Sequence, residues 1–340
     1  MRHVSDKALT RLRDGAGLPD LSGTRYRLLG QIARGGMGVV YTAEDKTLQR
    51  RVALKVLDLP GSDGELASRL MREARVLALL EHPGIVPVHD VGTLADGRIF
   101  YIMKFVEGQR LDRYLEGVAS IPDRLRIFLR VCDSVGFAHA RGVLHRDIKP
   151  ANVMVGSFGE VLVMDWGLAK IVAGAAGGAL PDAEATLFES TKPIAAENDS
   201  TQVSAITGHG TVLGTAGYMS PEQARGEVES LDGRSDIFSL GILLRFLLEE
   251  TNSAASAAPL DRSLEAVCAK ASAELPEARY AKVQDLAWDV SRYLDGLAVT
   301  AHRESIFEQA ARFYRRYRFF ILLIAAYLLM RLFLLLVLKR

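Results

Sequence analysis

The chain carries the stretch Val143-Leu144-His145-Arg146-Asp147-Ile148-Lys149-Pro150-Ala151-Asn152-Val153-Met154-Val155. Within it a carboxylate, Asp147, precedes an amide, Asn152, by five residues, and an apolar β-type run follows. A Gly-containing turn leads into a second apolar run that ends at Asp165, which predicts a hairpin with Asn152 and Asp165 beside its open end. Asp165 is a hard oxygen ligand of the kind that Mg²⁺ takes beside substrate phosphates. Asp147, on the preceding loop, is placed to accept a proton from an incoming hydroxyl group.

This arrangement resembles the catalytic loop and the magnesium loop of eukaryotic-type protein kinases, H-R-D-x-x-x-x-N and D-F-G. The second pattern reads DWG at residues 165–167, so a large aromatic side chain is kept where the family usually has Phe. The resemblance implies that Asp147 is the proton acceptor and that Asn152 and Asp165 hold Mg²⁺. Lys149 matches the Ser/Thr-specific pattern of the family and would offset charge on the γ-phosphate of ATP.

Length, charge and cysteine content limit the classes of protein to which the chain can belong. The 340 residues suffice for one two-lobed unit or two domains. Because 42 basic residues face 41 acidic ones, no basic field indicates nucleic-acid binding. Cys132 and Cys268 are the only cysteines, so neither a disulfide framework nor a cysteine metal site is expected and a reducing compartment is indicated. The N-terminus shows no apolar core like that of a signal peptide.

A glycine-rich loop is predicted between two strands at residues 26–41. Gly35, Gly36 and Gly38 would let backbone amides approach phosphate oxygens without a Cβ in the way. An ordinary Gly-rich hairpin would carry the same residues, so the loop alone leaves both interpretations open. The kinase pattern is G-x-G-x-x-G-x-V, and the loop departs from it only at Ala33, which stands at the first Gly.

Lys55 lies inside the apolar run of a predicted strand at residues 51–57, and a buried Lys needs a partner. Glu73 falls in the middle of the apolar stripe of a predicted helix at residues 66–80. An exposed helix in another register remains the alternative. In the family a Lys of the third strand pairs with a Glu of the first long helix, so the resemblance assigns this pair to Lys55 and Glu73, with Lys55 on the α- and β-phosphates.

The resemblance also implies where ATP would bind. Met103 would be the gatekeeper, and residues 104–106 would connect the lobes and offer backbone groups to the adenine ring. The residues assigned to ATP in this way are Ile32, Ala33, Gly35, Gly36, Gly38, Val40, Ala53, Lys55, Met103 and Val106.

A long segment follows the DWG sequence. Residues 171–210 are rich in Ala, Gly, Ser, Thr and acids and lack periodicity, which predicts an insertion without regular structure. The stretch GTAGYMSPEQARG at residues 214–226 resembles the end of the activation segment of bacterial Ser/Thr kinases, with Ser-Pro-Glu in place of A-P-E. The activation segment would therefore span residues 165–222. The resemblance implies that Thr215 lines the acceptor pocket.

Two threonines of this segment are candidate phosphorylation sites. Arg146 directly precedes Asp147, and a cation beside the base should disfavour order until an anion compensates it. Thr207 and Thr211 lie shortly before Thr215, where related bacterial kinases carry activating phosphothreonines. The alternative is that both are polar linker residues.

Three further helices are predicted in the second half of the chain. Residues 236–250 are apolar on nearly all sides apart from Arg245, which predicts a buried central helix. Only residues 251–262 separate it from a helix at 264–273, where the family has a longer loop and another helix. The last of these helices is predicted at residues 283–294. Before it, Arg279 matches the Arg that pairs in the family with the A-P-E glutamate, here Glu222.

Residues 319–338 form a run of 20 residues with one charge, Arg331, which is long enough to cross a bilayer core of about 30 Å. Apolar residues offset the roughly 2.5–3.5 kcal/mol cost of the arginine on the insertion scale. Because residues 301–318 are rich in Arg, we expect a single-pass helix in the cytoplasmic membrane with the preceding domain in the cytoplasm. The lipid bilayer is thus an expected partner. A buried soluble helix and an interfacial helix are the alternatives.

The expected fold class is α+β. After a flexible leader at residues 1–24, a small β-rich lobe with one main helix would span residues 25–105. A larger helical lobe would span residues 106–300, with ATP between the two lobes. A basic juxtamembrane segment, 301–318, and the transmembrane helix would complete the chain.

The resemblance identifies the chain as a bacterial Hanks-type Ser/Thr protein kinase that uses ATP and Mg²⁺ on protein Ser and Thr hydroxyls. A homodimer that phosphorylates itself in trans is left open as a further partner. A catalytically dead pseudokinase acting as a membrane scaffold is the alternative that Ala33, Trp166 and the shortened helical lobe leave open. A small-molecule kinase of related fold agrees poorly with the Ser-Pro-Glu sequence at residues 220–222.

Overall fold

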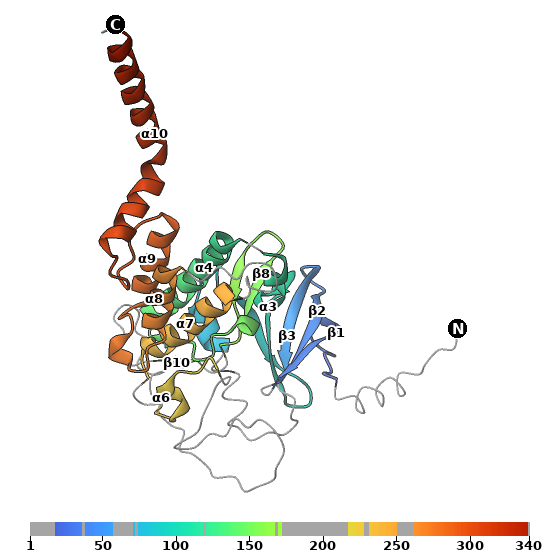
Figure 1. The fold of residues 1–340 in the computed structure, drawn as a ribbon. Helices are drawn as coiled ribbons and strands as arrows, with labels where there is room; N and C mark the ends of the chain where they lie inside the picture. Colours follow the sequence, from blue (N-terminus) through green and yellow to red (C-terminus); the bar gives the residue numbers. More distant parts are fainter. Residues whose placement is uncertain are drawn as a thin grey trace.

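The chain folds into two lobes, as Figure 1 shows. A β-rich lobe lies near the N-terminus, and a helical lobe ends in a long projecting helix. This computed structural model describes residues 18–35, 38–56, 71, 74–118, 120–166, 169–171, 217–227, 231–249 and 261–338. The predicted fold, a small β-sheet lobe followed by a larger helical lobe, is confirmed.

The small lobe is built on one antiparallel five-stranded sheet with the order β1-β2-β3-β5-β4. Side chains alternate across the sheet, so Tyr41, Ala43 and Leu54 enter the core of this lobe while Ala53 and Met103 face the helical lobe. The strands are β1 (Tyr26–Gly35), β2 (Gly38–Asp45), β3 (Arg50–Val56), β4 (Val88–Thr93) and β5 (Ile99–Lys104).

The small lobe begins earlier than residue 25. Leu21 is buried in the core of the sheet, and the backbone oxygen of Leu18 accepts a 3.3 Å hydrogen bond from the buried guanidinium group of Arg98. Residues 18–24 therefore belong to the lobe rather than to a flexible leader, because Leu21 supplies apolar surface to the core. The predicted main helix is described at residue 71 and residues 74–79.

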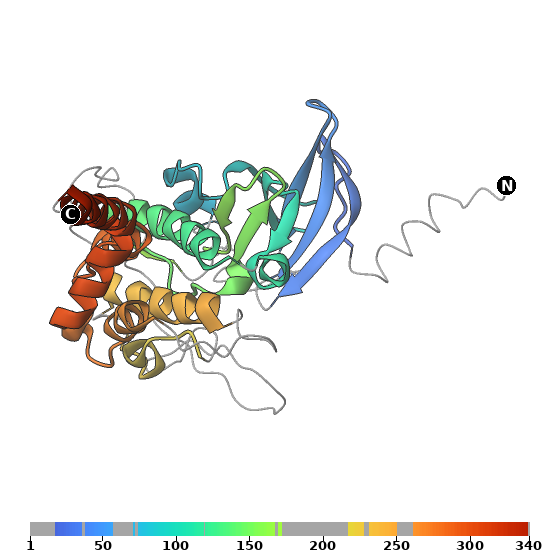
Figure 2. The same cartoon turned by 45° about the horizontal axis from the view of Figure 1, so that its top comes forward.

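Short strands connect the lobes and carry the loop that follows residue 144. The predicted hairpin is present, with β8 paired to β9, and Figures 1 and 2 both place it between the sheet of the small lobe and helix α4. These strands are β6 (Gly108–Arg110), β7 (Val143–Leu144), β8 (Val153–Gly156), β9 (Val161–Val163) and β10 (Lys170–Ile171).

Helices α4 and α7 form the centre of the helical lobe. The predicted helix over residues 236–250 is observed as α7, whose inward side chains, such as Leu240 and Leu244, are fully buried. Arg124 joins the two helices, since its guanidinium group donates to the backbone oxygens of Leu247 at 3.0 Å and Leu115 at 3.2 Å. The elements of this lobe are α3 (Leu111–Tyr114), η1 (Leu115–Gly117), α4 (Ile121–Ala140), η2 (Pro150–Asn152), α6 (Pro221–Ala224), α7 (Gly233–Glu249), α8 (Arg262–Ala271), η5 (Pro276–Ala278) and α9 (Val283–Leu294).

Helix α10 (Ile306–Leu338) points away from the helical lobe (Figures 1 and 2). The segment that leads into it is tied to that lobe, because Asp289 of α9 accepts hydrogen bonds from the backbone nitrogens of Thr300 at 2.6 Å and Ala301 at 3.0 Å. Among the residues that the structure describes, no helix has both the length and the hydropathy that crossing a membrane requires. The predicted transmembrane helix at residues 319–338 is therefore not supported there.

Candidate active site

The loop between β7 and β8 brings three of the predicted site residues together. Asp147 is buried, and its Oδ2 accepts hydrogen bonds from Lys149 Nζ at 2.7 Å and Asn152 Nδ2 at 2.9 Å. Asn152 Nδ2 also donates to the backbone oxygen of Asp147 at 2.9 Å. A carboxylate held by an ammonium group and an amide has a fixed orientation, and in this position it can accept a proton from a hydroxyl group.

The backbone of the same loop is held by Asp236, at the start of α7. The Asp236 carboxylate accepts hydrogen bonds from the backbone nitrogens of His145 at 2.8 Å and Arg146 at 2.7 Å, and it lies 2.7 Å from His139 Nε2. Burial of Asp236 opposes its ionisation, but the bonds to His139 and to the loop outweigh this effect and hold its pKa below the ordinary value. Arg146 has a φ of 71°, a conformation that costs a non-glycine residue about 1–3 kcal/mol. Asp236 therefore stabilises a strained turn immediately before Asp147.

Asp236 and His139 are not among the residues predicted from the sequence. The signal was present, however. Asp236 is an acid in a helix predicted to be buried on nearly all sides, and the same argument singled out Glu73 in its own helix. The sequence alone does not reveal the partner of Asp236, because the backbone nitrogens that donate to it lie about 90 residues away.

Lys55 and Asp165 meet across the two lobes. Lys55 Nζ lies 3.2 Å from Asp165 Oδ1, and the Lys55 side chain is nearly buried. Partial burial would raise the pKa of Asp165, but the neighbouring Lys55 ammonium outweighs it, so the pKa lies below its ordinary value. Asp165 itself has a φ of 59°, which turns the chain at the end of the hairpin. Glu73, the predicted partner of Lys55, lies outside the described residues, so that pair stays a prediction.

Trp166 packs beneath the loop rather than facing the solvent. Its ring is buried and lies 4.5 Å from the ring of His145, centroid to centroid. Its indole nitrogen donates to the backbone oxygen of Val163 at 3.3 Å, so its polar atom is satisfied. Tryptophan thus occupies a packed position with its hydrogen bond made, where the family usually has Phe.

Four of the residues assigned to ATP share one face of the small-lobe sheet. Val40 is the direct neighbour of Lys55 on the adjacent strand, and Ala53 is the neighbour of Met103. Since Ala53 and Lys55 are two residues apart, all four side chains share the face that looks toward the helical lobe. Of the remaining assigned residues, Ala33 pairs with Val40, Gly35 pairs with Gly38, Ile32 lies exposed at a strand bulge, and Val106 is buried after β5.

The donor set fits a magnesium nucleotide. Asn152 uses its amide nitrogen on Asp147 and so presents its amide oxygen as a hard ligand, while the Asp165 side chain is half exposed. Within the described part of the chain, no three His, Cys, Asp or Glu side chains lie close enough to hold a metal ion by themselves. Mg²⁺ is commonly held by one or two protein oxygens together with substrate phosphates, which is the arrangement that Asn152 and Asp165 allow. The nearby Lys55 ammonium adds a cation for the phosphates.

Glu222, in the first turn of α6, forms a buried pair with Arg279. Arg279 Nη1 lies 2.6 Å from Glu222 Oε1 and Nη2 lies 2.8 Å from Oε2, and Ser235 Oγ adds a third bond at 2.8 Å. Burial alone would raise the pKa of Glu222, but the bonds from Arg279 and Ser235 lower it to about 2. The remaining Arg279 donors bind backbone oxygens, among them those of Ala273 and Arg234. The pair fixes the end of the predicted activation segment to the helical lobe.

Several predicted site residues lie outside the described residues. These are Gly36, Glu73 and Thr215, together with the candidate phosphosites Thr207 and Thr211. Their assignments remain predictions.

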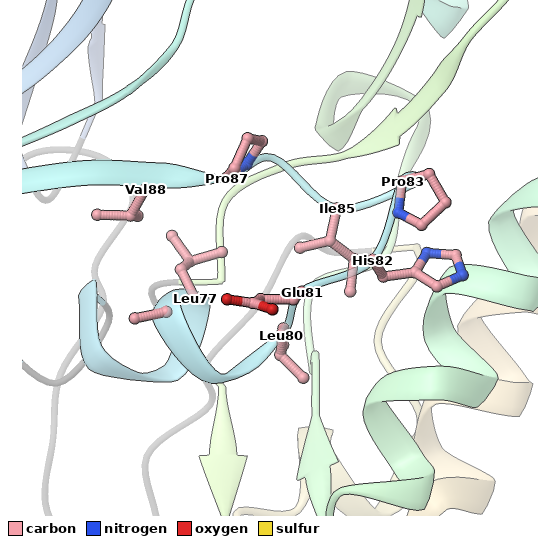
Figure 3. A pocket seen from close by; sticks show the side chains of 9 residues that line it. Leu77, Leu80, Glu81, His82, Pro83, Ile85, Pro87 and Val88 are labelled. Atoms are coloured by element: carbon pink, nitrogen blue, oxygen red, sulfur yellow. The ribbon is translucent and has the colours of Figure 1, made fainter.

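A separate cavity of about 490 Å³ lies beside the end of the helix at residues 74–79 (Figure 3). Its lining is mainly apolar, with Glu81 and His82 as the polar members. None of the residues assigned to ATP, to Mg²⁺ or to proton transfer lines it, so we give it no part in the chemistry. The lining residues are Leu77, Ala78, Leu80, Glu81, His82, Pro83, Ile85, Pro87 and Val88.

Comparison with protein families gives one match that covers most of the chain. The family model described as protein kinase domain matches residues 26–287. This range contains the catalytic loop, the Lys55–Asp165 pair and the Glu222–Arg279 pair. It ends within α9, before Asp289 and α10.

Similar proteins carry kinase names. The serine/threonine-protein kinase PknD of Protochlamydia amoebophila is 32% identical over 327 residues, which cover 83% of this chain and 31% of the relative. PknD of Chlamydia felis is 33% identical over 306 residues, with 80% and 31% covered. The chain thus spans about a third of the length of these relatives. Among solved structures, the PknI kinase domain of Mycobacterium tuberculosis superposes with a TM-score of 0.53 at 25% identity, covering 79% of this chain and 95% of that domain.

Proposed function

Because this chain belongs to the protein kinase domain family, we propose that it is a serine/threonine protein kinase, which transfers the γ-phosphoryl group of ATP to protein hydroxyls. The observation that carries the proposal is the joint placement of Asp147, Lys149 and Asn152 on one loop of the helical lobe, together with the ion pair between Lys55 of the small lobe and Asp165. The similar proteins that are named serine/threonine-protein kinases support the same activity.

Each residue has a distinct task in this proposal. Bound Mg·ATP supplies the phosphoryl group and a cation that neutralises its charge. Asp147 accepts the proton of the attacking hydroxyl group, and Asn152 keeps that carboxylate in one orientation. Lys149, 2.7 Å from Asp147, offsets negative charge beside the reacting group. Lys55 binds the α- and β-phosphates, while Asn152 and Asp165 offer oxygens to Mg²⁺. Positioning and charge neutralisation thus account for most of the catalysis.

A pseudokinase that acts as a scaffold is the second candidate. Ala33 at the first glycine position and the short connection after α7 favour it. The hydrogen-bonded Asp147 and the Lys55–Asp165 pair support the active kinase instead, because a scaffold needs neither. The discriminating experiment is incubation of the purified full chain with Mg·ATP and a protein substrate, followed by mapping of phosphosites by mass spectrometry. Phosphoserine or phosphothreonine supports the kinase, and unmodified chains support the scaffold.

We also propose that phosphorylation at Thr207 or Thr211 activates the enzyme, through a homodimer that phosphorylates itself in trans. The support is the charge of Arg146, which sits in a strained turn beside Asp147 and would gain from a nearby phosphate. Replacing both threonines with Ala should lower phosphorylation of a separate substrate while ATP binding stays nearly unchanged. Full activity of the double variant would locate the control elsewhere.

We propose, finally, that residues 319–338 hold the kinase at the cytoplasmic membrane, with the kinase domain in the cytoplasm. The sequence supports this by its 20 residues with one charge, and by Arg312, Arg315, Arg316 and Arg318 before them. The exposure of large apolar side chains on α10, such as Phe319 and Leu329, adds to the argument, since such surfaces mark interaction sites.

A further inference from the structure

Gln223 lies between the end of the activation segment and the catalytic loop. It is buried, with 3% of its surface exposed, in the short helix α6. Its Oε1 accepts hydrogen bonds from the backbone nitrogen of Ser220 at 3.2 Å and from Ser220 Oγ at 2.9 Å. Its Nε2 donates to the backbone oxygen of Arg146 at 2.9 Å. One side chain thus bonds the Ser-Pro-Glu sequence on one side and the residue before Asp147 on the other.

The amide of Gln223 has only one orientation that satisfies these contacts. On the Ser220 side the partners are an N–H and an O–H, both able to donate, so an oxygen must face them. On the Arg146 side the partner is a carbonyl oxygen, so the amide nitrogen must face it. Rotation of the amide by 180° would place donor against donor and acceptor against acceptor. These hydrogen bonds therefore fix the orientation of the Gln223 amide, and the amide in turn restrains the Arg146 carbonyl.

The peptide group that Gln223 holds is the one that leads into Asp147. Arg146 adopts a left-handed backbone with φ of 71°, and its N–H is held by Asp236 Oδ1 at 2.7 Å. Gln223 holds the carbonyl of the same residue, so the strained turn is restrained at both ends. The next N–H, that of Asp147, donates to His145 Nδ1 at 3.2 Å. Asp236 holds the entry to the turn, whereas Gln223 and His145 hold the carbonyl and the N–H of the Arg146–Asp147 peptide.

We propose that Gln223 is a positioning residue, which couples the end of the activation segment to the orientation of the Asp147 carboxylate. When α6 is docked, Gln223 sets the Arg146–Asp147 peptide in the plane that directs Asp147 to the acceptor hydroxyl group. When α6 is displaced, the Arg146 carbonyl loses the bond from Gln223 and the strained turn loses one of its restraints. The inference rests on the proposed kinase activity, because it assigns a partner to the residue that accepts the proton.

The test uses two substitutions at position 223 and a matched one at position 220. Gln223→Met keeps the length of the side chain but removes the donor to Arg146. Gln223→Glu, assayed at pH 8, keeps an acceptor for Ser220 while placing a second oxygen against the Arg146 carbonyl. Ser220→Ala removes the capping hydroxyl, but the backbone N–H of residue 220 still donates to Gln223 Oε1, so the amide keeps its orientation and its bond to Arg146. All three are made in the full chain, with kcat, the KM for ATP and the thermal midpoint measured.

Both Gln223 variants are expected to lose on the order of 10- to 100-fold in kcat with an unchanged KM for ATP, since a small misplacement of a catalytic group has an effect of this size. Ser220→Ala is expected to retain the wild-type kcat, with a lowered thermal midpoint. Two results overturn the inference: folded Gln223 variants whose kcat matches that of Ser220→Ala, or loss of ATP affinity in parallel with kcat. If wild type and Ser220→Ala both fail to transfer phosphate, the proposed function fails, and the inference falls with it.

Discussion

Asp236 Oδ1 accepts a 2.7 Å hydrogen bond from the backbone nitrogen of Arg146, although the two residues are 90 positions apart. This contact joins the central helix of the larger lobe to the loop that carries Asp147. It holds Arg146 in a left-handed conformation, and the bonds from His145 and His139 to the same carboxylate complete the attachment. The catalytic loop is thus anchored to α7, whose inward side chains such as Leu240 and Leu244 are fully buried, and this holds the backbone that leads into Asp147.

Asp236→Ala should destabilise the protein and reduce activity together. The substitution leaves the backbone N–H groups of His145 and Arg146 buried without their acceptor, so the free energy of unfolding should fall by about 3 kcal/mol or more. Urea denaturation of the purified variant measures this. Glu265→Ala, which removes an exposed acid from α8, is the control and should stay within about 0.5 kcal/mol of wild type. An Asp236→Ala protein as stable as this control would show that the anchor is dispensable.

The Glu222–Arg279 pair should make the free energy of unfolding depend on pH in the acid range. The pKa of Glu222 is about 2 in the folded protein and lies near 4.5 when the chain is unfolded. Because the folded value is the lower one, the pair contributes its full stability above pH 4.5 and loses it as the pH falls toward 2. The stability difference between wild type and Glu222→Gln should therefore be on the order of 2–3 kcal/mol at pH 7 and shrink toward pH 3. A difference that does not change between pH 7 and pH 3 would contradict the assignment.

Lys55→Met should slow phosphoryl transfer by about 10²–10³-fold, as the loss of one preorganised charge at a reacting centre commonly does. Lys55 contacts Asp165 in this structure, and its contact with Glu73 is predicted from the sequence. If all three groups act as a unit, adding Glu73→Gln to Lys55→Met should cost little more than Lys55→Met alone. Single-turnover rates of the two single variants and the double variant measure this coupling. Losses that multiply would mean that Lys55 and Glu73 act independently.

The last helix should determine where the protein is found. The full chain is expected to remain with the membrane fraction after washes in high salt and at alkaline pH. A chain that ends at Arg318 should appear in the soluble fraction with its kinase activity retained. Release of the full chain by salt alone would favour an interfacial helix held by its arginines over an embedded one.

The elements of the fold were largely predictable because their signals are local. The predicted helix over residues 283–294 is observed with the same bounds, and the hairpin before Asp165 follows from two apolar runs and a Gly-containing turn. The start of the small lobe was misplaced, because Leu21 is a single apolar residue in a polar stretch and only its contacts reveal its burial.

The candidate site was predictable where residues share a short motif, and not where the partner is remote. Asp147, Lys149 and Asn152 lie within six positions, so their proximity follows from one loop. Asp236 and Gln223 act on the same loop from 77 to 91 residues away, and neither distance leaves a periodic signal. Lys55 shows an intermediate case: its place in an apolar strand predicted a partner, Asp165 is one partner that the structure describes, and the predicted pair with Glu73 lies outside the described residues.

The central claim is that Asp147 carries the proton transfer of a protein kinase. Asp147→Asn keeps the size of the side chain but removes the proton acceptor, and general-base contributions are typically about 10²–10⁴-fold. The decisive measurement is the rate of phosphate transfer from Mg·ATP to a protein substrate by wild type and by this variant, with ATP binding measured for both. We expect ATP binding to be retained and the rate to fall by at least about 100-fold. An Asp147→Asn protein that binds ATP and transfers phosphate as fast as wild type would contradict the account.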